Sequence, residues 1–296
     1  TNTCPTKFDE LIQSCINNDP NKRSTAKKVL ENLKSNNNNN TANNNNNNID
    51  DYEYVLDVEL PKPKYNLDNI PQYDMIDYKS LKYGKELGQG ASAKVYEGMW
   101  ANLVTVAIKE FKNILIKDLT TQQEFIKEAI FLKKLKHPNI VQFHGCCIVP
   151  KFSIIIEFMS NGSLYDLIHK DKTIKLTFNL IIQIAIDIVN GLVYLHDKMN
   201  IIHRDMKSMN VLLGYNNKAK ITDFGLSKSN NQMSTMFGGA KGTYEYMAPE
   251  LAVNNPTYTF SCDVFSLAII LWELVTREIP YKDITNKFLI PTNVKD

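Results

Sequence analysis

The stretch that decides the fold is HRDMKSMNVLL at residues 203–213, which is followed by ITDFG at residues 221–225. Asp205, Asn210 and Asp223 bring two carboxylates and an amide into this short part of the chain. Oxygen ligands of this kind, with a base beside them, suit a hard divalent cation that is bound together with phosphates. Each motif alone has an ordinary explanation, because a lone histidine is usually a core residue and Asp-Phe-Gly can be a turn. Their occurrence together and in this order predicts a catalytic loop followed by a metal-binding segment.

A lysine upstream of these motifs ends the apolar run VAIK at residues 106–109. A lysine in an apolar strand is usually a solvated edge residue, but this one follows a glycine-rich hairpin. In that position its ammonium would point at the phosphates of a bound nucleotide. Such a lysine needs a carboxylate to hold it, and Glu124 and Glu128 lie one turn apart on the helical pattern that follows. Helical periodicity alone leaves the choice between the two open.

The glycine-rich stretch LGQGASAKV occupies residues 87–95, between two strand patterns. Glycines allow backbone N–H groups to approach phosphate oxygens without a side chain in the way. Gly88 and Gly90 would also fit an ordinary tight hairpin, so this motif alone is weak evidence. A dinucleotide-binding fold needs a helix directly after such a loop, whereas Val95 and the residues after it continue a strand. The sequence therefore excludes that fold.

Secondary-structure patterns change along the chain from strands to helices. Short runs rich in β-branched and aromatic residues predict an antiparallel meander at 82–87, 94–100 and 104–111. A helical stretch at 121–135, two strand-like runs at 141–148 and 152–158, and helical patterns at 176–198 and 262–276 follow. Strands first and helices later indicate an α+β protein in two lobes, with a small antiparallel β lobe and a mainly helical large lobe.

Composition limits the classes of partner and compartment. The 296 residues are 43% apolar and 22% charged, which is enough to bury a core. A net charge of +2 is too small to indicate nucleic acid or an anionic membrane as the main partner. Five cysteines form no Cys-x-x-Cys pair, which favours a reducing compartment, so we expect the cytoplasm. The apolar stretches at 180–196 and 267–275 are interrupted by polar residues or too short, so no membrane span is expected.

The first part of the chain differs in composition from the rest. Residues 1–34 predict two short amphipathic helices: one carries Phe8 and Cys15 on one face, and Ser24 can cap the other. Two such helices bury too little to be stable alone, so they need a partner. The asparagine runs that follow predict a disordered linker, and the linker and the segment after it are predicted to span residues 35–79. Two interpretations of the later part of this segment are open: an extended tether, or a stretch that lies along the folded domain.

Together these motifs resemble a eukaryotic protein kinase domain, specifically of the tyrosine-kinase-like group of serine/threonine kinases, over residues 81–282. The resemblance rests on the glycine-rich loop at 87–95, VAIK at 106–109, HPNIV at 137–141, the HRD loop at 203–210, DFG at 223–225, APE at 248–250 and DVFS at 263–266. It implies a two-lobed fold with ATP and Mg²⁺ as cofactors.

The resemblance also implies roles for individual residues. Asp205 accepts the proton of the substrate hydroxyl, Lys207 steadies the γ phosphate, and Asn210 and Asp223 carry magnesium. Lys109 holds the α and β phosphates and pairs with Glu128. The implied nucleotide-binding residues are Leu87, Gly88, Gly90, Val95, Ala107, Lys109, Glu128, Glu157, Met159 and Leu212, with Ile156 as gatekeeper.

Two residues of this resemblance point to the acceptor. Lys207 and Thr243 stand where kinases that act on tyrosine usually have other residues, so we expect protein substrates with serine or threonine acceptors. Arg204 beside the base resembles kinases whose activation segment is ordered by a phosphate, which implies an upstream activating kinase. Among the acceptors Ser227, Ser229, Ser234 and Thr235, the expected one is Ser234 or Thr235.

The sequence departs from the kinase pattern in three places. Ala93 and Ala268 stand where glycines are usual. The domain at 80–296 is expected to be truncated at its C-terminal end, while residues 1–34 resemble the end of a kinase large lobe. Two origins are open: the tail of a preceding kinase domain, or a permuted domain. In either case we expect the front helices to dock, with Arg23 of the permuted form meeting Glu250.

Two functions follow from this interpretation. The leading one is transfer of the γ-phosphoryl group of ATP to serine and threonine hydroxyls of proteins in signalling. The alternative is a pseudokinase-like scaffold that the truncated large lobe makes inactive. No catalytic residue is lost in the sequence, so the alternative depends on the truncation alone.

Overall fold

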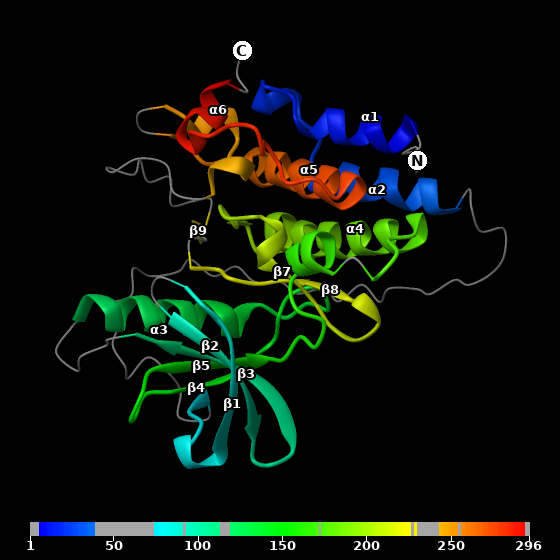
Figure 1. Cartoon of the computed structure of the whole chain (residues 1–296). Coiled ribbons are helices and arrows are strands. Elements are labelled where there is room, and N and C mark those ends of the chain that lie inside the picture. The colour runs from blue at the N-terminus through cyan, green and yellow to red at the C-terminus, as the bar shows by residue number, and fades with distance from the viewer. Residues whose placement is uncertain are drawn as a thin grey trace.

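Two lobes make up the described part of the chain: a small one built on a β-sheet and a large one built on helices (Figure 1). The computed structural model describes residues 6–38, 74–90, 93–112, 119–171, 173–225, 228–229, 243–253 and 256–293. The α+β architecture in two lobes that the sequence predicts is confirmed.

The small lobe contains a five-stranded antiparallel sheet and one long helix. The strands are β1 (Leu81–Gln89), β2 (Ala93–Trp100), β3 (Val104–Phe111), β4 (Phe143–Cys147) and β5 (Ser153–Glu157), in the order β1-β2-β3-β5-β4. Helix α3 (Leu119–Lys134) packs on the sheet beside β4. Phe125 of this helix meets the rings of Phe111 and Phe152 edge-on, at centroid distances of 5.3 and 5.1 Å.

Alternation along β3 decides which side chains face the large lobe. Val106 and Ile108 belong to a cluster on the outer face of the sheet, whereas Ala107 and Phe111 belong to the main core. Successive side chains of a strand point to opposite faces, so Lys109 lies on the same face as Ala107. The strand thus directs the lysine away from the outer cluster and toward α3.

The large lobe is built around two apolar helices, α4 (Phe178–Val193) and α5 (Phe260–Thr276). Helices α1 (Thr6–Cys15) and α2 (Ala26–Asn38) cover them, with α1 on α5 and α2 on α4 (Figure 1). Two strand pairs also belong to this lobe, β6 (Ile201–Ile202) with β9 (Lys228–Ser229) and β7 (Val211–Leu213) with β8 (Ala219–Ile221). The short helix α6 (Ile290–Asn293), single π-helical turns at Asp166–Lys170 and Tyr194–Lys198, and several short 3₁₀ turns complete the described elements of the lobe.

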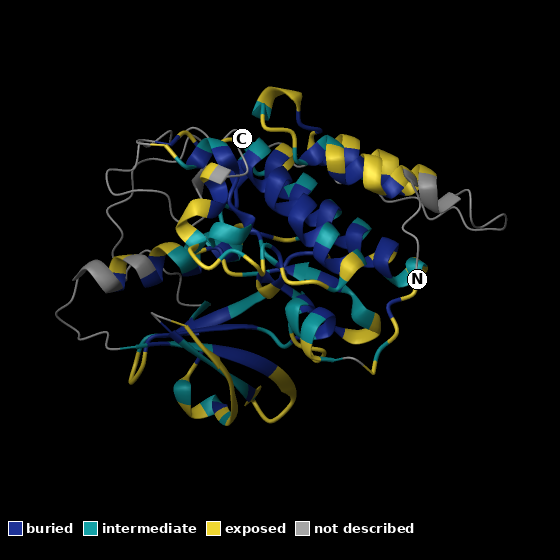
Figure 2. Ribbon diagram, turned by 45° about the horizontal axis from the view of Figure 1, so that its top comes forward, coloured by how far each residue is buried: buried dark blue, intermediate teal, exposed yellow. Residues whose placement is uncertain are grey.

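Helix α4 is a core helix. Thr177 caps it, because the Thr177 hydroxyl accepts a hydrogen bond from the Leu180 N–H at 3.3 Å. With the turn that follows, Phe178–Lys198 is long and apolar enough to cross a membrane, with a mean hydropathy of 1.7, but 56% of its most apolar 18-residue stretch is buried in the structure. Helices α2 and α5 and strand β8 cover it. A mostly buried helix of this composition is typical of a globular core (Figure 2).

The N-terminal helices differ in detail from the prediction. Thr25, and not Ser24, caps α2, since the Thr25 hydroxyl accepts from the Lys28 N–H at 3.3 Å. Ser24 is buried, and its hydroxyl donates to that of Ser14 at 3.0 Å. The helix extends to Asn38, into the first asparagine run, and the predicted linker from residue 39 to residue 73 lies outside the described residues.

Residues 74–80 already pack on the small lobe. The Asp74 carboxylate lies 2.6 Å from Lys133 Nζ on α3, and the Ile76 N–H donates to the Cys146 carbonyl at 2.8 Å. A Cβ at Gly145 would lie 2.7 Å from the Asp74 carbonyl oxygen, so only glycine allows this close approach. The end of the predicted tether is therefore part of the small lobe.

Candidate active site

An ion pair joins the sheet to helix α3 at the edge of the small lobe. Lys109 Nζ on β3 lies 2.6 Å from Glu128 Oε1, and the two side chains are 17% and 10% exposed. Of the two candidate carboxylates, Glu128 makes this contact, while the side chain of Glu124 lies outside the described residues. The position of α3 therefore decides whether the Lys109 ammonium is held in place.

A second carboxylate reaches the same ammonium from the large lobe. Asp223 Oδ1 lies 3.5 Å from Lys109 Nζ, and the Asp223 side chain is 48% exposed. Burial alone would lower the pKa of Lys109, but Glu128 and Asp223 outweigh it and raise that pKa. Burial would likewise raise the pKa of Asp223, but Lys109 and the positive groups nearby hold it below its ordinary value. Both groups are therefore charged at neutral pH.

Asp263 at the start of α5 anchors the catalytic loop. Its carboxylate is 1% exposed and accepts hydrogen bonds from the backbone N–H groups of His203 at 2.8 Å and Arg204 at 2.9 Å. His196 Nε2 lies 2.9 Å from the same carboxylate. Nε2 of the fully buried His203 lies 3.0 Å from the Thr222 carbonyl oxygen, which ties the loop to the segment that is predicted to bind metal. The buried carboxylate of Asp263 in the DVFS motif thus fixes the HRD loop, although the two motifs are far apart in sequence.

Three side chains orient the carboxylate of Asp205. Lys207 Nζ lies 2.8 Å from Asp205 Oδ2, and the Thr243 hydroxyl donates to Oδ1 at 3.3 Å. Asn210 Nδ2 donates to Oδ2 at 3.0 Å and to the Asp205 carbonyl at 2.7 Å. Lys207 Nζ also donates to the Thr243 hydroxyl at 3.0 Å. The structure therefore brings together all three residues that the sequence predicts as catalytic.

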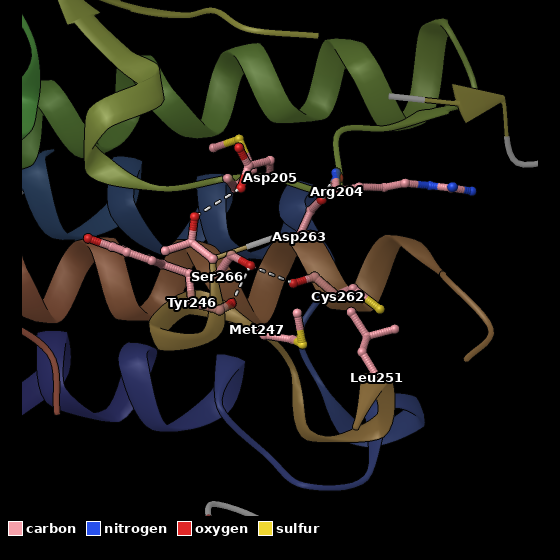
Figure 3. A pocket seen from close by; sticks show the side chains of 10 residues that line it. Arg204, Asp205, Tyr246, Met247, Leu251, Cys262, Asp263 and Ser266 are labelled. Atoms are coloured by element: carbon pink, nitrogen blue, oxygen red, sulfur yellow. Dashed lines mark hydrogen bonds between the residues drawn. The ribbon is translucent and has the colours of Figure 1, made fainter. Parts of the chain in front are cut away.

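A small cavity lies between this loop and α5 (Figure 3). Asp205, Tyr246, Cys262 and Ser266 are among the residues that line it, and its volume of about 10 Å³ leaves room for about one water molecule. Ser266 closes one side, because its hydroxyl donates to the Tyr246 carbonyl at 2.7 Å. This cavity is too small for a nucleotide, and it lies among the side chains that hold the loop of Asp205 against α5.

Asn210 and Asp223 can hold a divalent cation. The amide nitrogen of Asn210 is engaged by Asp205, which leaves Oδ1 as the atom that can face a metal. Across the described ranges, no cluster of three or more His, Cys, Asp or Glu side chains could bind a metal without other ligands. A cation here would complete its shell with phosphate and water oxygens, as Mg²⁺ does in nucleotide sites. The donor set therefore fits a metal that is shared with a triphosphate.

The glycine-rich turn is open where a phosphate would approach. A Cβ placed at Gly88 would meet nothing within 4 Å, and Leu87 is 42% exposed. The Gly90 N–H donates to the Ala93 carbonyl at 2.8 Å, and Lys112 Nζ donates to the Gly90 carbonyl at 2.7 Å. These contacts hold the base of the turn, whose tip at residues 91 and 92 lies outside the described residues.

The predicted adenine-binding residues lie where the two lobes join. Ala107 is 6% exposed and lies opposite Ile156 in the pairing of β3 with β5. Val95 and Leu212 are half-buried against the main core, and Met159 is 6% exposed.

The remaining predicted residue, Glu157, is held from both lobes. Its backbone N–H donates to the Gln142 carbonyl at 2.9 Å, and Lys220 Nζ of β8 lies 2.7 Å from each of its carboxylate oxygens. No sequence pattern pointed to Lys220, because its ion pair with Glu157 joins distant segments.

A buried acid on α5 was not expected from the sequence. Glu273 is fully buried; the Ser208 hydroxyl donates to Oε1 at 3.0 Å, the Tyr246 hydroxyl donates to Oε2 at 2.8 Å, and His169 Nε2 lies 2.7 Å from Oε1. Burial raises the pKa of Glu273. The carboxylate connects the catalytic loop with the segment around Tyr246. An acid inside the apolar helical pattern at 262–276 is the signal that could have found it.

The guanidinium of Arg204 has buried nitrogens without hydrogen-bond acceptors among the described residues. Its guanidinium lies 4.5 Å from the centroid of the Tyr258 ring, while Nε and Nη1 are buried and make no hydrogen bond within the described part of the chain. Arg204 has a φ of 72°, in the left-handed region. The side chains of the expected phosphate acceptors Ser234 and Thr235 lie outside the described residues, as do those of Ser227 and Ser229.

Comparison with known proteins agrees with this geometry. A family model described as protein tyrosine and serine/threonine kinase matches residues 81–295. Serine/threonine-protein kinase STY46 of Arabidopsis thaliana is 40% identical over 213 residues, which cover 71% of this chain and 36% of the relative. Probable serine/threonine-protein kinase drkA of Dictyostelium discoideum is 40% identical over 208 residues, covering 70% and 32%. Serine/threonine/tyrosine-protein kinase HT1 of Arabidopsis thaliana is 37% identical over 213 residues, covering 71% and 54%.

The chain therefore belongs to the protein tyrosine and serine/threonine kinase family. Within that family its relatives belong to the tyrosine-kinase-like group that the motifs indicated. The chain spans about a third to about a half of the length of these relatives. The family uses ATP with a divalent metal.

Proposed function

We propose that this chain transfers the γ-phosphoryl group of ATP to serine and threonine hydroxyls of protein substrates. The observation that carries the proposal is the convergence of Lys109, Glu128 and Asp223, from a strand, a helix and a loop, beside the loop that holds Asp205. Phosphoryl transfer needs mainly placement and charge neutralisation, which is what lysines and oriented carboxylates supply.

Asp205 is the proposed base. Lys207, Thr243 and Asn210 fix its carboxylate, so an oxygen can face the hydroxyl of an incoming substrate. The hydroxyl oxygen bonds to the γ phosphorus, the bond from that phosphorus to the β–γ bridging oxygen breaks, and the hydroxyl proton passes to Asp205. ADP leaves with the electrons of the broken bond. We propose Mg²⁺ as the metal, and when bound by Asn210 and Asp223 it neutralises charge on the phosphates.

Two observations support serine and threonine as acceptors. Lys207 and Thr243 lie 3.0 Å apart beside the base, as the serine/threonine resemblance implies. STY46 and drkA carry serine/threonine in their names, whereas the name of HT1 also includes tyrosine. Analysis of the phosphorylated amino acids therefore belongs in the first experiment.

The test is transfer of labelled phosphate from ATP to a generic basic protein, measured for the wild type and Asp205→Asn with Mg²⁺ present. We expect phosphoserine and phosphothreonine from the wild type and a signal lower by at least about 100-fold from the variant. An equal signal from both proteins would remove the enzymatic function and favour a nucleotide-binding scaffold. Phosphotyrosine as the main product would overturn the acceptor class.

An upstream activating kinase completes the proposal. Arg204 carries a guanidinium with two buried nitrogens that lack acceptors among the described residues, which suits a phosphate placed on the activation segment at Ser234 or Thr235. Mass spectrometry of active protein that shows both residues unmodified would contradict this.

The four buried cysteines of the described residues are free thiols, which supports a reducing compartment, and we propose the cytoplasm. Fractionation that places the protein outside it would contradict the proposal.

A further inference from the structure

Residues 6–38, here called the N-terminal module, lie on the side of the large lobe that faces away from the small lobe (Figure 1). Their helices pack on α4 and α5, which follow them in the chain by more than a hundred residues. In sequence the module precedes the catalytic part, but in space it forms the outer layer of the lobe that carries the catalytic loop.

The module is joined to the lobe by one shared core. Phe8 and Cys15 of α1 and Val29 and Leu33 of α2 are 1%, 0%, 0% and 0% exposed, and all belong to the core cluster that runs through α4 and α5. Phe8 meets the ring of Phe178 edge-on at 6.3 Å. Two short helices do not form such buried faces alone, so these side chains depend on the lobe, and the lobe depends on them for cover.

One arginine makes the contact specific. Arg23 lies between the two helices, its side chain is fully buried, and its two terminal nitrogens lie 2.5 and 2.7 Å from the two carboxylate oxygens of Glu250. The guanidinium also donates to the Ser261 carbonyl at 3.2 Å and lies 5.1 Å from the ring centroid of Phe265. A bidentate ion pair of this geometry fixes both the position and the orientation of the guanidinium relative to the carboxylate.

Glu250 connects the module to the reactive groups. It belongs to the loop at residues 243–251, which begins at Thr243 beside the carboxylate of Asp205. Tyr246 of the same loop is held by Ser266 and Glu273 of α5. Two ends of one short loop are thus fixed, one at the base and the other at Arg23.

We propose that the N-terminal module is a non-covalent partner of the large lobe that needs no chain connection to stay bound. The binding surface is formed by α4, α5 and Glu250, and the partner it fits is a helix pair with an apolar stripe and an arginine at the turn between the helices. This proposal does not depend on the proposed kinase function.

The experiment uses the full chain with a site for a sequence-specific protease within residues 43–48. After cleavage we expect the two fragments to elute together in gel filtration and phosphate transfer to stay within about twofold of the uncut protein. Arg23→Ala should make the cut fragments separate, whereas Lys22→Ala, whose side chain is 72% exposed, is the matched control and should not. Separation of the cut wild-type fragments would overturn the non-covalent partnership, whatever happens to activity.

Cysteine labelling provides a readout that does not depend on activity. Cys15 of the module and Cys262 beneath Glu250 are 0% and 3% exposed, so alkylation followed by site-resolved mass spectrometry reports undocking. Arg23→Ala should speed labelling of both by at least about tenfold, because undocking exposes them. Cys146 and Cys147 are buried in the small lobe and should not change. Faster labelling at all four would indicate general unfolding and overturn the assignment.

A charge exchange keeps the proposal testable if Arg23→Ala folds poorly. Arg23→Glu alone places two carboxylates together and should make the cut fragments separate. Arg23→Glu combined with Glu250→Arg should restore part of their co-elution. Cut fragments of Arg23→Glu that elute together, with Cys15 labelled at the wild-type rate, would overturn the role of the pair in docking. A wild type that transfers no phosphate but keeps its cut fragments together would refute the proposed function and leave the docking intact.

Discussion

Replacing Asp263 by asparagine should show how far one buried carboxylate supports the catalytic loop. Asp263 accepts hydrogen bonds from the N–H groups of His203 and Arg204 and lies against His196. Asparagine has the same shape but only one acceptor oxygen. At least one of these donors would therefore face an N–H₂ group and lose its partner.

The magnitude follows from the burial of the group. A hydrogen bond to a charged group contributes about 1.5–3 kcal/mol, and a buried donor left without a partner costs about 1–3 kcal/mol. Removing one member of a buried charged network costs about 3–5 kcal/mol in total. For a domain of this size that corresponds to a fall in melting temperature of roughly 6–20 °C. The loop that carries Asp205 is attached at this point, so kcat should fall by at least about tenfold with a smaller change in KM.

The assay is urea denaturation followed by circular dichroism, with phosphate transfer measured on the same preparations. Asp197→Asn is the matched control, because Asp197 is exposed and should change stability by less than about 0.5 kcal/mol. The slope of the unfolding free energy against urea should stay the same. A variant at Asp263 that loses less than about 1 kcal/mol and keeps wild-type kcat would refute the reasoning.

Three further predictions concern charge, acid and packing. Lys109→Met leaves Glu128 without its cation, so phosphate transfer should fall at least about 100-fold while the free energy of unfolding falls by only about 1–3 kcal/mol, and unchanged transfer would contradict the site. Burial would raise the pKa of Asp263, but the hydrogen bond and charge interaction with His196, together with other positive groups and N–H donors, outweigh burial and lower that pKa. The contribution of Asp263 to stability is therefore present above about pH 4 and should be lost as the pH falls below that value. Acid titration of Asp263→Asn should therefore be flatter than that of the wild type, and parallel curves would count against the shift. Gly145→Ala should cost about 1–3 kcal/mol, because its Cβ would lie 2.7 Å from the Asp74 carbonyl oxygen, whereas Gly88→Ala, with nothing within 4 Å, should leave the melting temperature unchanged.

The sequence predicted the fold class and the residues that carry local motifs. Strand and helix periods located the sheet and the two central helices, and short spacings within one segment placed Asp205 beside Asn210. The antiparallel order of the small lobe was accessible for the same reason, because consecutive strands separated by turns pair with each other.

Contacts between distant segments were less accessible. Periodicity could not choose between Glu124 and Glu128, since the choice depends on how α3 lies on the sheet. Glu273 was missed because its partners come from three segments that only the folded lobe brings together. The sequence predicts the cap of α2 at Ser24, one residue before the observed cap at Thr25, because serine and threonine have the same capping chemistry. Ser24 is buried in the folded lobe, so it does not serve as the cap. Local pattern thus identifies chemistry, and tertiary packing assigns partners.

Most of the asparagine tract lies in sequence between two fixed points, Asn38 at the end of α2 on the large lobe and Asp74 on the small lobe. The entropy of closing a loop between fixed points grows only slowly with length, by about 0.6 kcal/mol for each doubling. Repeat expansion or contraction of the tract would therefore change the stability of the catalytic part very little. Alleles that differ in the number of asparagines should be close to neutral, and natural selection would leave the length of the tract free to drift.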